Sequence, residues 1–260
     1  MKKLLLSLLF IIPITVANGQ GNLPDTLKKT PLAIQDSVKA SQVRPKSLIL
    51  PGSLILYGAL SFAVQPIRNF DYHIQSEVTK NNPNFSTKVD NYLPFTPIAI
   101  VYGLNLAGVE GQHRFADRTA LLGISGAIFG LTTRPTKKLT HRLRPNGVDY
   151  LSFPSGHTSF AFMAAEFLAQ EYGDKSPWYS VLGYSIATTT GVLRIYNNDH
   201  WVSDVVAGAG FGILSTRVAY LIYPTVKKWV THGDKKTGKY TMIIPTYQDG
   251  VPGLSLSMGF

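Results

Sequence analysis

The sequence predicts an all-α fold: a bundle of about six helices, followed by a small β-hairpin at the C-terminus. Long stretches without charge, separated by polar turns, are typical of core helices, and they cover residues 47–67, 91–109, 119–133, 176–193 and 205–216. A sixth helix is expected at 158–172, where Phe160, Met163 and Phe167 recur at helical spacing. After residue 235 the pattern changes to alternation around Asp249-Gly250, which indicates a turn between two short strands.

The first residues have the composition of a targeting segment. Lys2 and Lys3 precede an apolar run at 4–16 and the small-residue sequence Ala17-Asn18-Gly19. That run is shorter than the about 20 residues that a spanning helix needs. We therefore expect a signal peptide at 1–19 and an exported chain, with a polar, proline-containing arm at 20–46.

The charge and composition of the chain limit the kinds of molecule that it can be expected to bind. The net charge of +10 suits nucleic acid, anionic lipid or phosphorylated substrates, but export and the lack of a dense aromatic and basic stripe argue against nucleic acid. The chain has no cysteine, which excludes disulfides and thiolate metal sites. Three uncharged runs approach spanning length, whereas the mean hydropathy of +0.07 is low for a polytopic protein. The sequence thus leaves open whether the helices span a bilayer or associate with its surface.

Two segments carry groups that suit a phosphate. Lys137 and Arg144 are seven residues apart, so a continuous helix would place both cations on one face, where the Arg fork can bind phosphoryl oxygens. Alternatively they belong to a solvated basic surface. In Ser155-Gly156-His157, free amides at a helix start can hold an anion, and the histidine can donate a proton. The alternative is an ordinary helix cap.

The third segment pairs a histidine with a carboxylate. His200 and Asp204 are separated by four residues, the spacing that brings two side chains together on a helix. The carboxylate can fix the tautomer of the imidazole, so that its other nitrogen points at a substrate. Arg194 adds a third cation upstream. A capping Asp beside a surface histidine is the alternative.

Taken together, the three segments resemble the signature of the type 2 phosphatidic acid phosphatase (PAP2) superfamily, which includes the vanadium haloperoxidases. That signature reads Lys, six residues, Arg-Pro; then Pro-Ser-Gly-His; then Ser-Arg, five residues, His, three residues, Asp. The chain matches it at Lys137, Arg144, Pro145, Pro154, Ser155, Gly156, His157, Arg194, His200 and Asp204. It departs at Leu193, where the family usually has Ser. The resemblance covers roughly residues 50–224, which defines a PAP2-type phosphatase domain at 47–230 and a C-terminal tail at 231–260.

The resemblance implies a chemical role for each matched residue. His200 would form a phosphohistidine, Asp204 would orient it, and His157 would protonate the leaving group. Phosphate binding would fall to Lys137, Arg144, Arg194 and the amides near Ser155 and Gly156. Neither a metal nor a cofactor is expected.

The expected enzyme is a phosphatase on the periplasmic side, associated with a membrane. Apolar helices beside the site favour a lipid-linked phosphate: phosphatidic acid, phosphatidylglycerophosphate, undecaprenyl diphosphate or the lipid A phosphate. One alternative is a soluble, broad-specificity periplasmic acid phosphatase acting on small phosphate esters. A vanadate-dependent haloperoxidase is disfavoured by the short chain, and a lipid-binding protein on the same fold by the full set of catalytic positions. The sequence selects neither the leaving group nor the oligomeric state.

Overall fold

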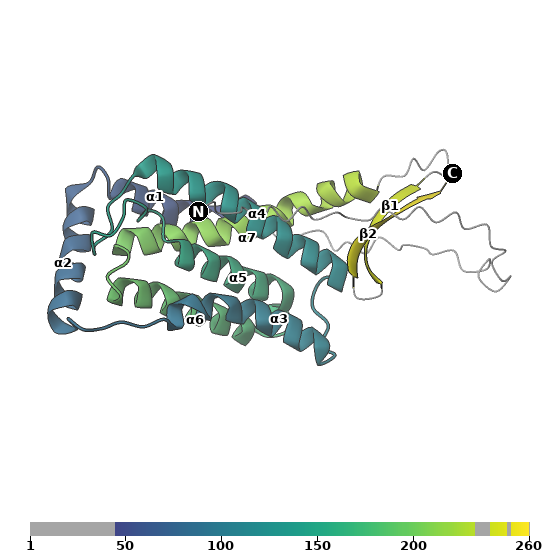
Figure 1. Ribbon diagram of the computed structural model, residues 1–260, viewed down its shortest axis with the longest axis horizontal. Coiled ribbons are helices and arrows are strands. Elements are labelled where there is room, and N and C mark those ends of the chain that lie inside the picture. Colours follow the sequence, from purple (N-terminus) through teal and green to yellow (C-terminus); the bar gives the residue numbers. More distant parts are fainter. Residues whose placement is uncertain (1–44, 232–239, 249–250, 260) are drawn as a thin grey trace, which may run out of the picture. The chain divides into compact units, whose positions relative to one another are not determined.

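The computed structural model describes residues 45–231, 240–248 and 251–259. The predicted signal peptide at 1–19 and nearly all of the arm at 20–46 lie outside these residues. The all-α prediction is confirmed for the bundle, which contains seven α-helices among the described residues (Figure 1). They are α1 (Ile49–Leu60), α2 (Gln65–Asn81), α3 (Thr96–Leu106), α4 (Phe115–Thr140), α5 (Gly156–Tyr172), α6 (Pro177–Tyr196) and α7 (Val202–Thr231). Short 3-10 turns occur at Pro45–Leu48, Val89–Asn91 and Leu93–Phe95.

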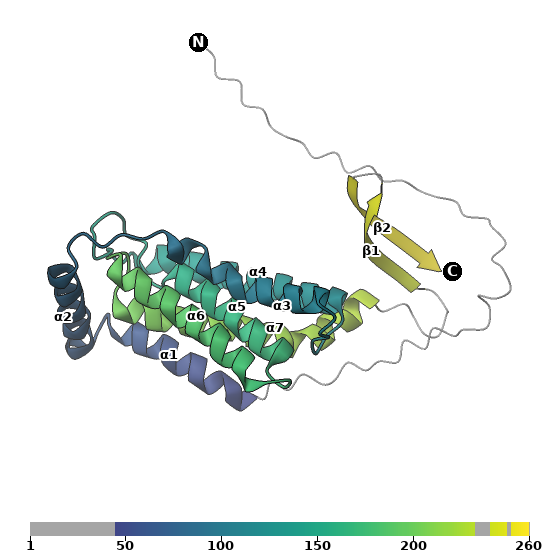
Figure 2. The same cartoon turned by 90° about the horizontal axis from the view of Figure 1, so that it is seen from below.

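The helix that the sequence did not predict is α2. The uncharged run at 47–67 breaks into two helices at Ser61–Val64, because Val64 is extended and Pro66 starts the next helix. The two segments meet at an angle of 85°. As a result α2 lies across one end of the bundle while the other helices run along it (Figures 1 and 2).

The centre of the bundle is α5, which packs against α3, α4 and α6. Its buried side includes Phe167, Leu168 and Tyr172, which form one core cluster with Leu121 of α4. Gly208 and Gly212 of α7 allow this helix to approach α5 closely. A Cβ on Gly208 would lie 2.9 Å from the carbonyl oxygen of Ser155, so a larger residue there would push the two helices apart.

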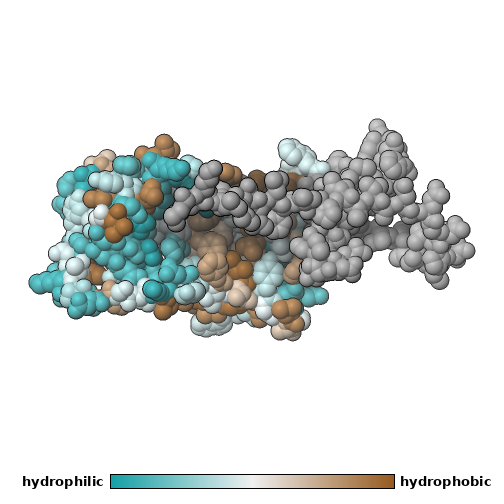
Figure 3. All heavy atoms as spheres, in the orientation of Figure 1, coloured by the Kyte–Doolittle hydropathy of each residue, from teal (hydrophilic) through white to brown (hydrophobic). Residues whose placement is uncertain are grey.

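Apolar side chains are also found on the outside of the bundle. Leu106, Leu131, Leu139 and Trp178 are strongly exposed on or next to α3, α4 and α6, and Figure 3 shows apolar patches on the face in view. Among the described residues, Val202–Trp229 is the one helix that is long and apolar enough to cross a membrane, and 56% of its apolar window is buried inside the protein. This result fits both a core helix and a spanning helix.

Two strands follow the bundle, β1 (Tyr240–Gln248) and β2 (Val251–Gly259). They pair antiparallel, with Tyr240 opposite Gly259 and Gln248 opposite Val251. A two-stranded ribbon on its own is marginal in water. The hairpin as a stable element of the tail at 231–260 therefore stays a prediction.

Candidate active site

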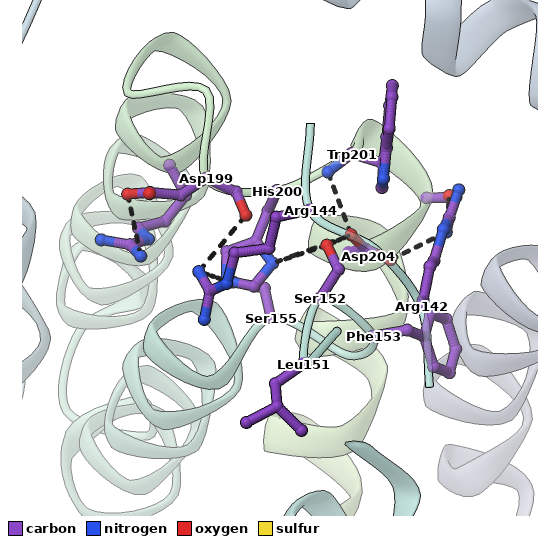
Figure 4. Close-up of polar contacts among 12 residues, drawn as sticks. Arg142, Arg144, Leu151, Ser152, Phe153, Ser155, Asp199, His200, Trp201 and Asp204 are labelled. Atoms are coloured by element: carbon purple, nitrogen blue, oxygen red, sulfur yellow. Dashed lines mark hydrogen bonds and ion pairs between the residues drawn. The ribbon is translucent and has the colours of Figure 1, made fainter. Parts of the chain in front are cut away.

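The three sequence segments meet at one end of the bundle, where the chain after α4, the start of α5 and the turn before α7 lie together (Figure 4). A cavity of about 370 Å³ is found there. Five of the predicted site residues line it: Lys137, Arg144, Gly156, His157 and His200. The structure thus gathers in one place groups that are up to 63 residues apart in the chain (200 − 137 = 63).

The imidazole of His200 is buried and held from behind. Its Nδ1 lies 3.5 Å from the hydroxyl of Ser152 and 3.7 Å from Oδ2 of Asp204. The second distance is too long for a hydrogen bond, so the Ser152 hydroxyl, which donates to Asp204 at 2.5 Å, links the two groups. Burial lowers the pKa of His200 to about 4, although the negative charge of the nearby Asp204 acts to raise this pKa. The ring is therefore neutral at pH 7.

His200 lies outside the helix on which the sequence analysis placed it. Because α7 begins at Val202, the predicted pairing of His200 and Asp204 on one helix face is wrong. The histidine lies in the preceding turn, after Asn198, which has a left-handed conformation with φ of 59°. The two groups stay close because the backbone N–H of Trp201 also donates to Asp204, at 3.0 Å.

Asp204 is in turn held by a partly buried arginine that the sequence analysis did not select. Arg142 donates to Oδ1 of Asp204 at 2.8 Å and, with its other terminal nitrogen, to Asp71 at 2.8 Å. Asp71 also accepts hydrogen bonds from the backbone N–H and the hydroxyl of Ser203. In Figure 4, Arg142 lies on the far side of Asp204 from His200. Both carboxylates have no exposed side-chain surface, so they are paired as buried charges must be.

Lys137 lies in the last turn of α4 and reaches the cavity. Its Nζ donates to the carbonyl oxygens of Leu151 at 2.6 Å and Ser152 at 3.4 Å. Burial is the main cause that lowers the pKa of Lys137, to about 8, and the positive charge of Arg144 adds to it. The ammonium is still mostly charged at pH 7.

Arg144 reaches the same cavity by a different route from the one predicted. Its expected place on the helix face of Lys137 is wrong, because α4 ends at Thr140 and His141 is left-handed with φ of 46°. Arg144 lies in the following turn, where its Nε donates to Asp149 at 2.8 Å. Its Nη1 lies 3.4 Å from Nε2 of His200. A charged fork thus stands beside the nitrogen that faces the cavity.

At the start of α5 the two predicted amides have different surroundings. The N–H of Ser155 donates to the carbonyl oxygen of Asp204 at 3.0 Å, and its side chain caps the helix at Thr158. Gly156 lines the cavity, where a Cβ would lie 3.5 Å from the side chain of Lys137. Free amides at a helix start favour an anion. Gly156 and His157, rather than Ser155, therefore bring the α5 terminus to the cavity.

Arg194 lies behind the cavity instead of lining it. It pairs with Asp90 at 2.5 Å and with Asp199 at 2.9 Å. Its charge still acts on the site. Burial is the largest cause of the lowered pKa of His157, and the positive charge of Arg194 is the second. Of the three predicted cations, Lys137 and Arg144 reach the cavity directly.

Fold and site together define a helical bundle with a cation-lined cavity, in which a buried histidine is backed by a buried carboxylate. A family model for the PAP2 superfamily matches residues 118–228, a range that contains every predicted site residue. Residues 118–228 of the chain thus match the PAP2 superfamily, as the three motifs predicted.

Among curated relatives, the lipid A 1-phosphatase of Porphyromonas gingivalis is 36% identical over 231 residues, covering 84% of this chain and 49% of the relative. A probable lipid phosphate phosphatase of Arabidopsis thaliana is 28% identical, covering 62% of this chain and 68% of the relative. This chain thus spans about half the length of the first of these. Among solved structures, a transmembrane PAP2 type phosphatidylglycerolphosphate phosphatase from Bacillus subtilis has a TM-score of 0.43 at 18% identity, covering 70% of this chain and 98% of that one.

Proposed function

We propose that this chain is a phosphatase that hydrolyses a lipid-linked phosphate ester through a phosphohistidine at His200. The observation that carries the proposal is the neutral imidazole of His200, held from behind by Ser152 and Asp204, in a cavity that Lys137 and Arg144 also line. A phosphoryl group in this cavity would meet two cations and one nucleophile. That combination suits phosphoryl transfer, in which catalysis consists mainly of positioning and charge stabilisation.

In the first step, the lone pair on Nε2 of His200 attacks phosphorus. The bond between phosphorus and the ester oxygen breaks, and that oxygen leaves with the bonding electrons and a proton from His157. The proton on Nδ1 of His200 stays, because the Ser152 hydroxyl accepts from it and donates to Asp204. The imidazolium that forms is stabilised by the negative charge of Asp204.

His157 must carry a proton at this moment, although burial lowers its pKa. A bound phosphate supplies the compensation, because a dianion beside the ring favours the charged imidazolium. In the second step, His157, now neutral, takes a proton from water. The oxygen of this water attacks phosphorus, the bond to His200 breaks, and inorganic phosphate leaves.

The lipid character of the substrate is supported by three observations. Pro94, Phe95 and Phe160 form an apolar wall of the same cavity, and the rings of Phe95 and Phe160 are 4.9 Å apart. The bundle has exposed apolar side chains on its outer faces. The named activities of the two curated relatives are on lipid phosphates. Of the lipids considered, we propose the lipid A type, which the more similar relative favours.

We further propose that the chain is exported and works at the periplasmic face of a membrane. This proposal depends on the signal-like residues 1–19, which the structure does not describe, and on the exposed apolar surface. The phosphatase domain would be 47–230, with the arm at 20–46 and the tail at 231–260 as accessory segments. Fractionation of cells expressing a C-terminally tagged chain tests it: recovery in the cytosol with residues 1–19 attached would refute export.

Activity is tested with the full chain purified in detergent. Phosphate release is measured from lipid A, phosphatidic acid and p-nitrophenyl phosphate, for the wild type and His200→Ala. We expect release from the lipids by the wild type only, and a trapped phosphoenzyme only when His200 is present. His73→Ala is the matched control, because His73 is exposed on α2. A folded His200→Ala variant with near-normal turnover would refute the assignment of the nucleophile.

A further inference from the structure

A second cavity lies next to the candidate active site. Its volume is about 460 Å³, within the range of small-ligand sites. It opens at the bend between α1 and α2, and the residues used below belong to its wall: Phe62, Arg68, Tyr72, Arg142, Arg144 and Trp201. Arg144 is part of both linings, so the two cavities meet at this residue. The second cavity therefore begins one side chain away from the nitrogen of His200 that Arg144 contacts.

The charge of this cavity is set by Arg68. The guanidinium donates from Nε to the carbonyl oxygen of Ser61 at 3.3 Å and from Nη2 to that of Phe62. An arginine has five N–H donors, so three of them (5 − 2 = 3) stay available. Among the residues that the structure describes, Arg68 has no carboxylate partner, whereas the charge of Arg142 is offset by Asp71 and Asp204. The cavity thus has a cation that suits an anionic group.

Aromatic rings form the other part of the wall. Tyr72 is 49% exposed and Phe62 is 40% exposed, so part of each side chain is open to a ligand, although Arg142 covers the ring of Phe62. The rings of Tyr72 and Trp201 meet edge to face at 5.3 Å, which keeps both in place. Flat apolar surfaces beside a few fixed polar groups suit a ring that has one apolar face and polar edges. A sugar has this character, and an acyl chain does not.

We propose that this second cavity binds the sugar head group of the substrate, and that Arg68 holds an anionic group on that sugar. The inference builds on the proposed function, because the reacting phosphate would lie at His200 while the sugar extends past Arg144. It narrows the substrate to a phosphorylated glycolipid that has a second anionic group. Arg68 also stabilises the end of α1 through its two carbonyl contacts, so the test must separate this role from ligand binding.

Binding is measured by isothermal titration calorimetry on the full chain in a His200→Ala background, which makes the result independent of turnover. The ligands are glucose 1,6-bisphosphate, glucose 1-phosphate and glycerol 3-phosphate. Comparing glucose 1,6-bisphosphate with glucose 1-phosphate reports on the second anionic group. Comparing glucose 1-phosphate with glycerol 3-phosphate reports on the sugar ring. The variant Arg68→Gln removes the charge but keeps an amide that can donate to the carbonyl oxygens of the bend. Lys80→Gln is the matched control, because it removes an exposed cation from the same helix.

We expect the bisphosphate to bind about tenfold more tightly than the monophosphate, as one charge-assisted hydrogen bond allows. Arg68→Gln should reduce this preference to about twofold, while Lys80→Gln should keep it. Tyr72→Leu should weaken the preference for glucose 1-phosphate over glycerol 3-phosphate, and this arm decides the question if Arg68→Gln does not fold. Equal binding of all three ligands by the His200→Ala parent, or an unchanged preference in a folded Arg68→Gln, would overturn the inference. Failure of the proposed function would appear separately, as absent phosphate release by the wild type while the His200→Ala parent still prefers the bisphosphate.

Discussion

Replacing Arg142 with methionine tests how the buried charges behind His200 support the site. The guanidinium lies between two carboxylates, those of Asp71 and Asp204, at 2.8 Å from each. Methionine has a similar length and no charge, so Arg142→Met would leave both carboxylates buried without their cation. Asp204 would keep its hydrogen bonds from Ser152 and from the backbone of Trp201.

The size of the effect follows from the burial of the two carboxylates. Unit charges about 4 Å apart interact by about 4 kcal/mol at an effective dielectric constant near 20. Removing one partner of a buried ion pair usually costs ~3–5 kcal/mol. We therefore expect Arg142→Met to lower the free energy of unfolding by ~3–5 kcal/mol. We also expect kcat to fall about ten- to a hundredfold, as for loss of other groups that orient a reacting residue, with KM changing less.

Denaturant unfolding and steady-state kinetics on the same preparation separate the two effects. The double variant Arg142→Met/Asp71→Asn removes one of the two unpaired charges, so it should recover part of the lost stability. Its kcat should stay low, because Asp204 still lacks its arginine. If Arg142→Met loses less than about 1 kcal/mol, the buried charges are not coupled as the distances indicate. If kcat recovers together with stability, Arg142 acts on the fold alone.

Three further predictions concern other parts of the molecule. His157→Ala should slow hydrolysis of an alkyl phosphate far more than that of p-nitrophenyl phosphate, because an activated phenolate leaves without a proton; equal slowing of both would contradict its role as the acid. Because the pKa of Lys137 is lowered to about 8, its charge is lost as the pH rises through 8, so KM should increase above that pH. Lys137→Arg should remove this increase, since arginine stays charged, and a KM that still rises would assign the titration to another group. Glu171 accepts hydrogen bonds from Arg118 and Tyr220 and has no exposed surface, so Glu171→Gln should lower the free energy of unfolding by ~3–5 kcal/mol. Its kcat should be unchanged, because 14 residues of α5 place it about 21 Å from His157, and a lower kcat in the folded variant would contradict this.

The fold was predictable where hydrophobic pattern decides it, and less so where charges interrupt the pattern. Five helices appear in the sequence as uncharged runs, and α5 shows apolar residues at helical spacing. By contrast α2 carries Arg68 and Asp71 on sides that face other parts of the protein, so its sequence resembles a polar surface segment. The end of α4 was also missed, because a left-handed His141 is a backbone conformation that side-chain spacing does not encode.

The same reason explains which parts of the site the sequence could predict. His157, His200 and Asp204 have side chains that do chemistry, and their spacing along the chain forms a motif. Asp71 supports them from 133 residues away (204 − 71 = 133), in a helix without any such motif. Its importance arises only when folding removes water from both carboxylates, since an exposed ion pair at the same distance contributes ~1 kcal/mol or less. A reacting group can therefore be found from the spacing of residues in the sequence, whereas the group that fixes its orientation has to be found from burial in the structure. Arg142 joins the two kinds of group, because it pairs with Asp204 of the motif and with Asp71 outside it.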